Sequence, residues 1–230
     1  AAELAYVRDM GLNAIRLEGK MEPEPFFELT DRLGILVLAG WCCCSHWELW
    51  DDWREEDHLI AAESLRSQIQ RLRSHPSLLV WLNSSDLPPP ARVEKSYLGV
   101  LEELRWPNPV VSNASARPAE HSGATGVKMN GPYEWIPPSY WLTDTRYGGA
   151  WGFATEVGPG PVVPPYESLR QMLPESSLWP IDEQWSFHAG SGRYKKLTVF
   201  SEALSARYGA PEGVRDYAFK AQLLAYEGLR

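Results

Sequence analysis

Apolar residues recur along the first half of the chain in two alternating patterns. Spacings of three and four positions, typical of amphipathic helices, occupy four segments. These segments are residues 1–10, 22–33, 57–74 and 91–104. Between them lie short apolar runs typical of strands buried on both faces of a parallel sheet. The runs are residues 13–17, 35–39, 78–82 and 110–112. This alternation predicts an α/β fold with parallel strand pairing, either a barrel or a doubly wound sheet.

The second half of the chain has a weaker pattern, interrupted by Gly and Pro. Short strands are expected at residues 127–129 and 152–155, and a long proline-rich segment at residues 157–180. Two helices, at residues 197–208 and 213–229, are expected to close the chain. The sequence has no Gly-x-Gly-x-x-Gly motif and no phosphate-binding P-loop motif. We therefore expect no nucleotide site and no cofactor.

Two of the predicted strands end in an isolated carboxylate. The run at residues 78–82 leads through three polar residues to Asp86, which prolines follow. The strand at residues 152–155 leads to Glu156, which Gly and Pro follow. Strand ends that project acids into loops are where (β/α)8 barrels, or TIM barrels, place their chemistry. We therefore favour a barrel and expect Asp86 and Glu156 to face one cleft.

Hydrolysis of a glycosidic bond requires such a pair of carboxyl groups. Asp86 follows an apolar strand, and partial desolvation there would favour the protonated form that a general acid needs. The alternative role of Asp86 is the N-cap of the helix predicted to begin near residue 91. Glu156 has no following helix to cap, and its alternative is a charged loop residue or a member of a buried ion pair.

A third acid, Glu18, ends the strand predicted at residues 13–17. A carboxylate at this position is suited to a substrate ammonium group or to a pair of hydroxyls. Arg16 lies two positions earlier and therefore on the same face of the strand. The alternative is thus an ion pair of Glu18 with Arg16 or with another cation.

The chain is rich in aromatic residues, with 11 Trp and 10 Tyr among 230 residues. Aromatic rings stack on the apolar C–H faces of sugars, and they equally pack beneath loops. Several lie in or beside the loops predicted to follow strands. Among them we expect Trp41, Tyr133 and Trp151 to contact substrate. The other candidates are Trp47, Trp135, Tyr140 and Trp141.

Charge and cysteine usage narrow the classes of function. The net charge of −8 is unsuited to binding nucleic acid, and no apolar run is long enough to span a bilayer. The only cysteines, Cys42, Cys43 and Cys44, are consecutive, and adjacent cysteines do not make an ordinary structural disulfide. We expect free, mostly buried thiols and no metal site, because no set of residues with metal-ligand spacing accompanies them.

A set of short motifs extends over nearly the whole chain. The motifs are Gly11-Leu-Asn-Ala-Ile-Arg-Leu-Glu-Gly19, Glu22-Pro with Phe26-Phe27, Gly40-Trp with Cys43-Cys44 and Trp47-Glu48, Ser85-Asp86, Ser115-Ala-Arg-Pro118, Val127-Lys-Met-Asn-Gly-Pro-Tyr133, and Tyr208-Gly-Ala210. Together they resemble the catalytic barrel of glycoside hydrolase family 2. More narrowly, they resemble the exo-β-D-glucosaminidases, which trim glucosamine from the ends of chitosan.

The resemblance implies roles for individual residues. Asp86 would be the general acid/base and Glu156 the nucleophile of a retaining glycosidase, and Glu18 would hold the 2-ammonium group of the substrate. Most of the wider family has Asn-Glu where this chain has Ser85-Asp86, a departure that marks the glucosaminidase branch. Cys42 stands where the glucosaminidases tend to carry Glu, which bears on substrate contacts near that strand more than on the chemistry.

The resemblance also implies a domain context. The family's full enzymes carry β-sandwich domains before and after the barrel. Residues 1–230 would form a partial TIM-barrel catalytic domain without the first and last strands. The expected activity is release of glucosamine from the non-reducing ends of chitosan oligosaccharides, at an extracellular location. The alternatives are a carbohydrate-binding or inactive barrel fragment, and a glycosidase of the β-mannosidase or β-galactosidase type.

Overall fold

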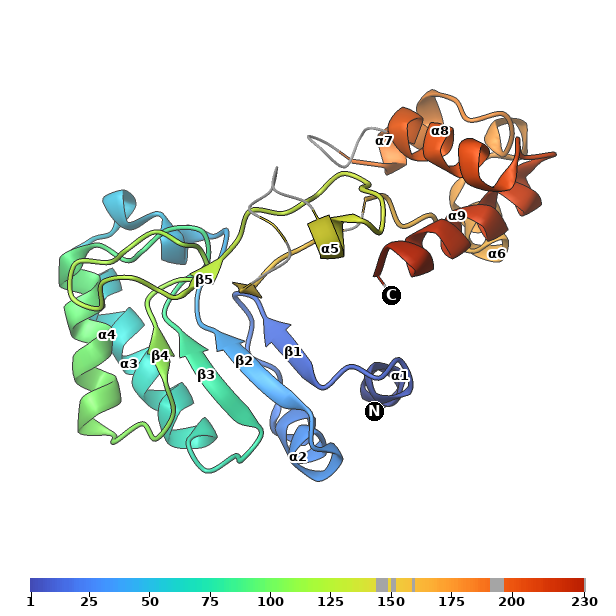
Figure 1. The fold of residues 1–230 in the computed structure, drawn as a ribbon. Helices are drawn as coiled ribbons and strands as arrows, with labels where there is room; N and C mark the ends of the chain where they lie inside the picture. Colours follow the sequence, from blue (N-terminus) through green and yellow to red (C-terminus); the bar gives the residue numbers. More distant parts are fainter. Residues whose placement is uncertain (144–148, 150–151, 159, 191–196, 230) are drawn as a thin grey trace. The chain divides into compact units, whose positions relative to one another are not determined.

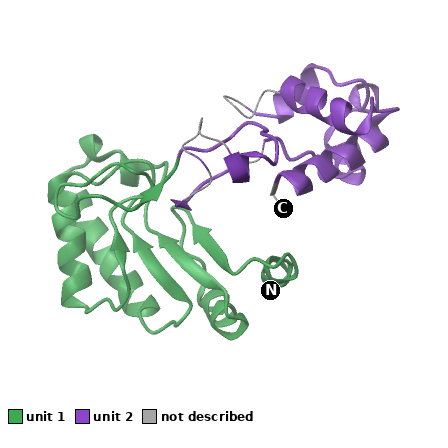
Figure 2. Ribbon diagram, viewed as in Figure 1, with its two compact units in different colours: residues 1–129 green, residues 130–230 purple. Residues whose placement is uncertain are grey.

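The chain divides into two compact units (Figure 2). Residues 1–129 form the first unit and residues 130–230 the second. The computed structural model describes residues 1–143, 149, 152–158, 160–190 and 197–229. Among the described helices, none is both long enough and apolar enough to cross a membrane.

The first unit is built on a parallel sheet of four strands in the order β1-β2-β3-β4 (Figure 1). The strands are β1 (Ala14–Leu17), β2 (Leu36–Gly40), β3 (Leu78–Leu82) and β4 (Val110–Val111). Each agrees to within a residue with an apolar run of the sequence. The register sets Leu17 opposite Ala39, and Ala39 opposite Trp81. The prediction of an α/β fold with a parallel sheet is therefore confirmed.

Helices connect successive strands of this sheet. They are α2 (Glu24–Leu33), α3 (Glu55–Leu72) and α4 (Ala91–Glu103), while α1 (Ala2–Asp9) precedes β1. The sequence explains the two ends of α2. Pro25 lies in the first turn, where its missing N–H leaves no helical hydrogen bond unmade, and Gly34 ends the helix with a left-handed φ of 67°.

Apolar side chains cover both faces of the sheet. The helix-facing core includes large side chains that are at most 1% exposed, namely Phe27, Leu65, Ile69, Leu72, Trp81 and Tyr97. The opposite face carries a smaller cluster around Leu38, Leu82 and Ala114. Cover on both faces explains why the strands are continuous apolar runs and not alternating ones.

The second unit consists mainly of helices around a core of its own. They are α5 (Tyr140–Thr143), α6 (Tyr166–Met172), α7 (Glu183–His188), α8 (Leu197–Tyr208) and α9 (Val214–Leu229). Leu169, Trp185, Phe200 and Tyr217, from four of these helices, meet in the core, and each is at most 5% exposed. The two predicted C-terminal helices are confirmed as α8 and α9.

The sequence pattern misses α5, α6 and α7, of which α6 lies within the proline-rich segment. The prolines that favour a loop here stand in front of helices, where proline is tolerated. Pro165 is the N-cap of α6, for example. The side chain of Asp182 caps α7 by accepting from the backbone N–H groups of Gln184 and Trp185.

The remaining elements are short. The two further strands are β5 (Val127–Lys128) and β6 (Phe153–Ala154). Three 3-10 turns complete the set, namely η1 (His46–Glu48), η2 (Trp50–Asp52) and η3 (Glu175–Ser177). Both β5 and β6 fall within the ranges that the sequence predicts.

Candidate active site

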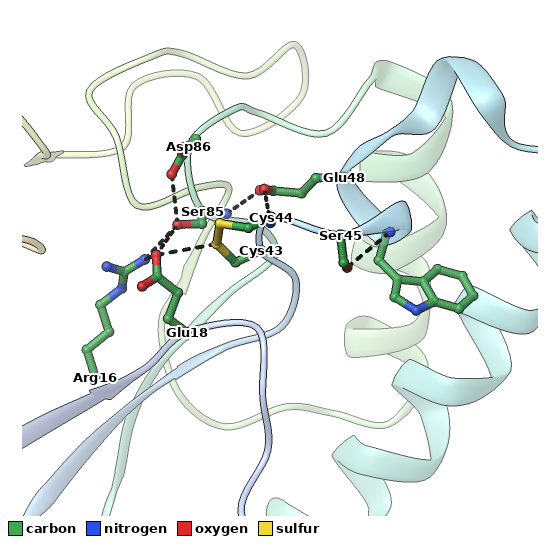
Figure 3. The surroundings of a disulfide bond; sticks show 9 residues. Arg16, Glu18, Cys43, Cys44, Ser45, Glu48, Ser85 and Asp86 are labelled. Carbon is green, nitrogen blue, oxygen red and sulfur yellow. Dashed lines mark hydrogen bonds and ion pairs between the residues drawn. A yellow bond between two sulfur atoms is a disulfide. The ribbon is translucent and has the colours of Figure 1, made fainter. Parts of the chain in front are cut away.

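The loops that follow β1, β2 and β3 bring a set of polar side chains together (Figure 3). Glu18 directly follows β1, and Asp86 lies four residues after the end of β3. The carboxyl ends of parallel strands meet at one edge of the sheet, which is where α/β proteins hold their ligands. In the first unit, Glu18, Ser85 and Asp86 meet at this edge.

The hydroxyl of Ser85 connects the charged groups of this cluster. Its Oγ accepts from Arg16 Nη2 at 2.7 Å and lies 2.9 Å from Glu18 Oε1 and 3.2 Å from Asp86 Oδ1. A hydroxyl has one proton, so Ser85 donates to Glu18 or to Asp86 but not to both at once. Ser85 thereby couples the carboxylate after β1 to the carboxylate after β3.

Arg16 and Glu18 form the ion pair that the sequence offers as an alternative for Glu18. Arg16 Nη2 lies 3.1 Å from Glu18 Oε1, and the side chains are 12% and 40% exposed, respectively. Among the described residues, all the contacts of the Glu18 carboxylate are made through Oε1. The ion pair therefore holds Glu18 in place through one of its two carboxylate oxygens.

Glu48 ties the loop after β2 to the loop after β3. Its Oε1 accepts from the backbone N–H of Ser85 at 2.8 Å, and its Oε2 accepts from the backbone N–H of Cys44 at 2.9 Å. Hydrogen bonds to a carboxylate are stronger than those between neutral groups. In the sequence, Glu48 stands out only as part of the Trp47-Glu48 motif. An acid within the turn η1 that follows β2 was the available signal.

The expectation of free thiols is wrong for two of the three cysteines. Cys43 and Cys44 form a disulfide, while Cys42 is free and buried. Cys44 takes a left-handed φ of 57°, and this tight turn lets the side chains of adjacent residues meet. For Cys42 the expectation is confirmed, and burial raises the pKa of its thiol to about 12.

The disulfide lies against Glu18 because two glycines permit it. Cys43 Sγ is 3.5 Å from Glu18 Oε1. A Cβ on Gly19 would be 2.9 Å from the backbone N of Cys43, and a Cβ on Gly40 would be 2.3 Å from the carbonyl oxygen of Leu17. Any larger residue at these positions would push the loops after β1 and β2 apart.

Asp86 and Glu156 belong to different units. Asp86 Oδ1 lies 3.2 Å from Ser85 Oγ in the first unit, whereas Glu156 follows β6 in the second unit and is half-buried. The alternative role of Asp86 as a helix cap is wrong, because Pro90 is the N-cap of α4 and no side chain caps that helix. That the two carboxyl groups face one cleft stays a prediction.

The predicted aromatic contacts differ in their surroundings. Trp41 packs on the buried Trp81, with ring centroids 5.8 Å apart, at the edge of the helix-facing core. It also lines a cavity of about 280 Å³. Tyr133 is half-buried in the second unit, and Trp151 lies outside the described residues. Their roles in substrate binding stay predictions.

Most of the other aromatic candidates have structural roles. Trp47 packs edge-on against Trp53, with centroids 5.5 Å apart, and Trp135 packs against the core of the second unit. The Tyr140 hydroxyl donates to the carbonyl of Gly149, and Trp141 Nε1 donates to the carbonyl of Gly228. Packing beneath loops, the alternative offered for these rings, accounts for their positions.

Comparison with known proteins identifies relatives over nearly the whole chain. An exo-β-D-glucosaminidase of Streptomyces avermitilis is 44% identical over 238 residues, covering 99% of this chain and 26% of that protein. One of Amycolatopsis orientalis is 40% identical over 243 residues, covering 100% of this chain and 24% of that protein. The chain thus spans about a quarter of the length of these relatives. No family model matches it.

A solved structure agrees with these sequence relatives. The crystal structure of the Amycolatopsis orientalis exo-chitosanase CsxA matches with a TM-score of 0.86 at 38% identity, covering 99% of this chain and 28% of that one. In fold, the chain is thus similar to part of a glycoside hydrolase. In sequence, its resemblance to the exo-β-D-glucosaminidases is confirmed.

Proposed function

We propose that the whole protein to which this chain belongs is a retaining exo-β-glycosidase. Its substrate would be a chitosan oligosaccharide, from whose non-reducing end it releases glucosamine. The observation that carries the proposal is the cluster of Glu18, Ser85 and Asp86 at the strand ends of a parallel sheet. Two relatives with similarity over 99% or more of the chain are exo-β-D-glucosaminidases.

We further propose that residues 1–230 form one catalytic domain, a (β/α)8 barrel without its first and last strands. Four parallel strands in sequential order, with the connecting helices on one face, are the arrangement of consecutive barrel units. Missing strands and flanking β-sandwich domains would belong to the rest of the protein. The relatives, about four times as long as this chain, leave room for both.

The catalytic roles follow from the two-carboxylate mechanism. Glu156 attacks the anomeric carbon while protonated Asp86 gives its proton to the leaving oxygen, and a covalent glycosyl–enzyme forms. Asp86 then takes a proton from water, whose oxygen attacks the anomeric carbon and releases the sugar from Glu156. Net retention of configuration results from the two displacements.

Two solved structures of CsxA support this assignment. In one an aspartate is replaced by alanine and in the other a glutamate, and each is a complex with PNP-β-D-glucosamine. The two replaced positions of that enzyme are separated by nearly the same number of residues as Asp86 and Glu156. An aspartate and a glutamate at this spacing are the pair that the mechanism needs.

Glu18 is proposed to select the amino sugar. Its carboxylate is 40% exposed, and the Arg16 ion pair engages one of its two oxygens. A 2-ammonium group can then donate a charge-assisted hydrogen bond to the other oxygen, Oε2. Glucose offers only a neutral hydroxyl there, and an acetamido group adds bulk while it removes the charge.

The test uses the whole protein and three chromogenic β-glycosides, of glucosamine, glucose and N-acetylglucosamine. We expect the highest kcat/KM for the glucosaminide. Preference for a neutral sugar would overturn the substrate assignment and favour a β-mannosidase or β-galactosidase type of activity. Binding of chitosan oligosaccharide without release of any aglycone would overturn the enzyme assignment and favour the carbohydrate-binding alternative.

A further inference from the structure

The disulfide between Cys43 and Cys44 lies beside Glu18, the residue proposed to bind the substrate ammonium group (Figure 3). The two sulfur atoms and a carboxylate oxygen of Glu18 all lie within 4.8 Å of one another. Cys43 Sγ makes the closest approach, 3.5 Å from Oε1. The mechanism proposed above gives the disulfide no role.

The position of the disulfide is fixed from several sides. The Glu48 carboxylate holds the backbone N–H of Cys44, and the same carboxylate holds Ser85. On the other side, the backbone N–H of Gly19 donates to the carbonyl of Gly40 at 3.2 Å, which joins the loop that carries Glu18 to the end of β2. The contact between the disulfide and Glu18 is therefore built into the loops.

The oxidation state of the sulfurs decides what they offer to Glu18. A disulfide sulfur carries no hydrogen, so it contacts the carboxylate without donating to it. A cysteine thiol has an S–H that donates a weak hydrogen bond. A thiol that donates to Oε1 would reduce the negative charge that Oε2 offers to a substrate ammonium group, and a thiolate would repel the carboxylate.

We propose that the Cys43–Cys44 disulfide is a positioning element that keeps the Glu18 carboxylate available for an ammonium group. Oxidised, it supports Glu18 without occupying an acceptor site. Reduced, it weakens the preference for the amino sugar. The proposal rests on the assignment of Glu18 as the ammonium ligand.

Reduction by a dithiol such as dithiothreitol balances as a two-electron exchange. The S–S bond of the protein breaks, and each sulfur gains one electron and one proton. The dithiol loses two electrons and two protons and closes to its own cyclic disulfide. Thiol alkylation followed by peptide mass analysis measures how far the exchange has gone.

The experiment compares oxidised and reduced whole protein on the chromogenic β-glucosaminide and β-glucoside. On reduction we expect KM for the glucosaminide to rise about two- to tenfold, the value of one hydrogen bond, while its kcat and the glucoside parameters stay nearly constant. A loss of folding would lower activity on both substrates alike, so the ratio of the two kcat/KM values isolates the effect on Glu18.

Three variants test the cause. The double variant C43A/C44A has no sulfur donor beside Glu18. It should keep the preference for the glucosaminide, and the reductant should not change its ratio of kcat/KM values. The double variant C43S/C44S, which places hydroxyl donors there, should have the weakened preference without reductant. C42A removes a buried thiol outside the disulfide and should respond to the reductant as the native protein does.

The outcomes separate this inference from the proposed function. A native enzyme without a preference for the glucosaminide contradicts the role of Glu18, and the inference fails with it. A native enzyme that keeps an unchanged preference after alkylation shows both thiols to be reduced contradicts the inference alone. A response to reductant that persists in C43A/C44A assigns the effect to other cysteines of the protein and also overturns it.

Discussion

The two proposed catalytic carboxylates lie in regions that the chain builds in different ways. Asp86 follows a five-residue strand whose last two residues are buried, and its neighbour Ser85 is held through both its backbone and its hydroxyl. Glu156 follows β6, a two-residue strand in which Phe153 is 48% exposed. The acid is thus ordered by contacts within its own unit, whereas the nucleophile follows a short strand whose two side chains are exposed. The two carboxylates therefore need separate tests.

Substitution of Glu156 is expected to cause the largest loss of activity. In the whole protein, Glu156→Gln should lower kcat by at least about three orders of magnitude, because no covalent intermediate can form. Azide should partly restore turnover to Glu156→Gly by occupying the vacated space and attacking the anomeric carbon. Nuclear magnetic resonance of the glycosyl azide gives the configuration of the product. Full activity of either variant would remove Glu156 from the mechanism and leave only the first unit with a catalytic group.

Asp86→Asn should have a smaller effect that depends on the leaving group. General acid catalysis contributes about 10²- to 10⁴-fold, and activated aryl glycosides need little of it. We expect hydrolysis of chitosan oligosaccharide to fall far more than hydrolysis of a nitrophenyl glycoside. Steady-state kinetics on both substrates measures the difference. Equal losses on the two would show that Asp86 is not the acid.

The contrast between the two units also explains what the sequence predicts and what it misses. Helical spacing of apolar residues predicts α1 to α4, and short continuous apolar runs predict β1 to β4, because burial of these residues imposes both patterns. The sequence pattern does not predict the short helices α5 to α7, because tertiary packing of single residues such as Trp185 stabilises them. Their own sequences hold too few turns for a period to be recognised.

In the candidate site, too, the sequence predicts some features and misses others. Position at the end of a strand singles out Glu18 and Asp86 in the sequence, and the parallel sheet of the first unit brings them together. The sequence does not predict the hydrogen bonds of the Glu48 carboxylate or the Cys43–Cys44 disulfide. Both depend on the path of the loop after β2, which a left-handed residue and two close glycine contacts determine. No period or spacing in the sequence encodes that path.

Glu18 tests whether the first unit also sets substrate choice. Glu18→Gln keeps the shape but loses the charge, and a charge-assisted hydrogen bond is worth about 1.5–3 kcal/mol. The ratio of kcat/KM for glucosaminide over glucoside should therefore fall about 10- to 150-fold. Glu18→Asp, which keeps the charge on a shorter side chain, should retain part of the preference. An unchanged ratio in Glu18→Gln would move substrate selection elsewhere in the protein.

Glu48 tests whether the hydrogen bonds around Ser85 order the acid. Glutamine has one acceptor oxygen, so Glu48→Gln can accept from Ser85 or from Cys44 but not from both. We expect kcat on chitosan oligosaccharide to fall roughly tenfold, the value of one charged hydrogen bond, with a smaller loss on the nitrophenyl glycoside. Glu63→Gln on the exposed face of α3 is the matched control. Equal behaviour of the two variants would contradict a positioning role for Glu48.

The smallest effect concerns stability and again separates the units. His75, which is 9% exposed, contacts Asp31 at 2.7 Å through Nδ1 and Glu24 at 2.9 Å through Nε2. Burial acts to lower the pKa of His75, but the hydrogen bonds to the two carboxylates outweigh it and raise the pKa above its usual value. The folded state therefore favours the protonated ring.

This pairing gives the first unit a defined pH dependence. Its contribution is complete below the unfolded pKa of about 6.5 and is lost as pH rises through the higher folded value. We expect it to be about 1 kcal/mol, measured by hydrogen exchange of α2 and β3 after correction for intrinsic rates. His75→Gln should remove the dependence, while His188→Gln at an exposed position of the second unit should leave it intact. A first unit whose exchange has the same pH dependence in the His75→Gln variant as in the native protein would contradict a stabilising charge on His75.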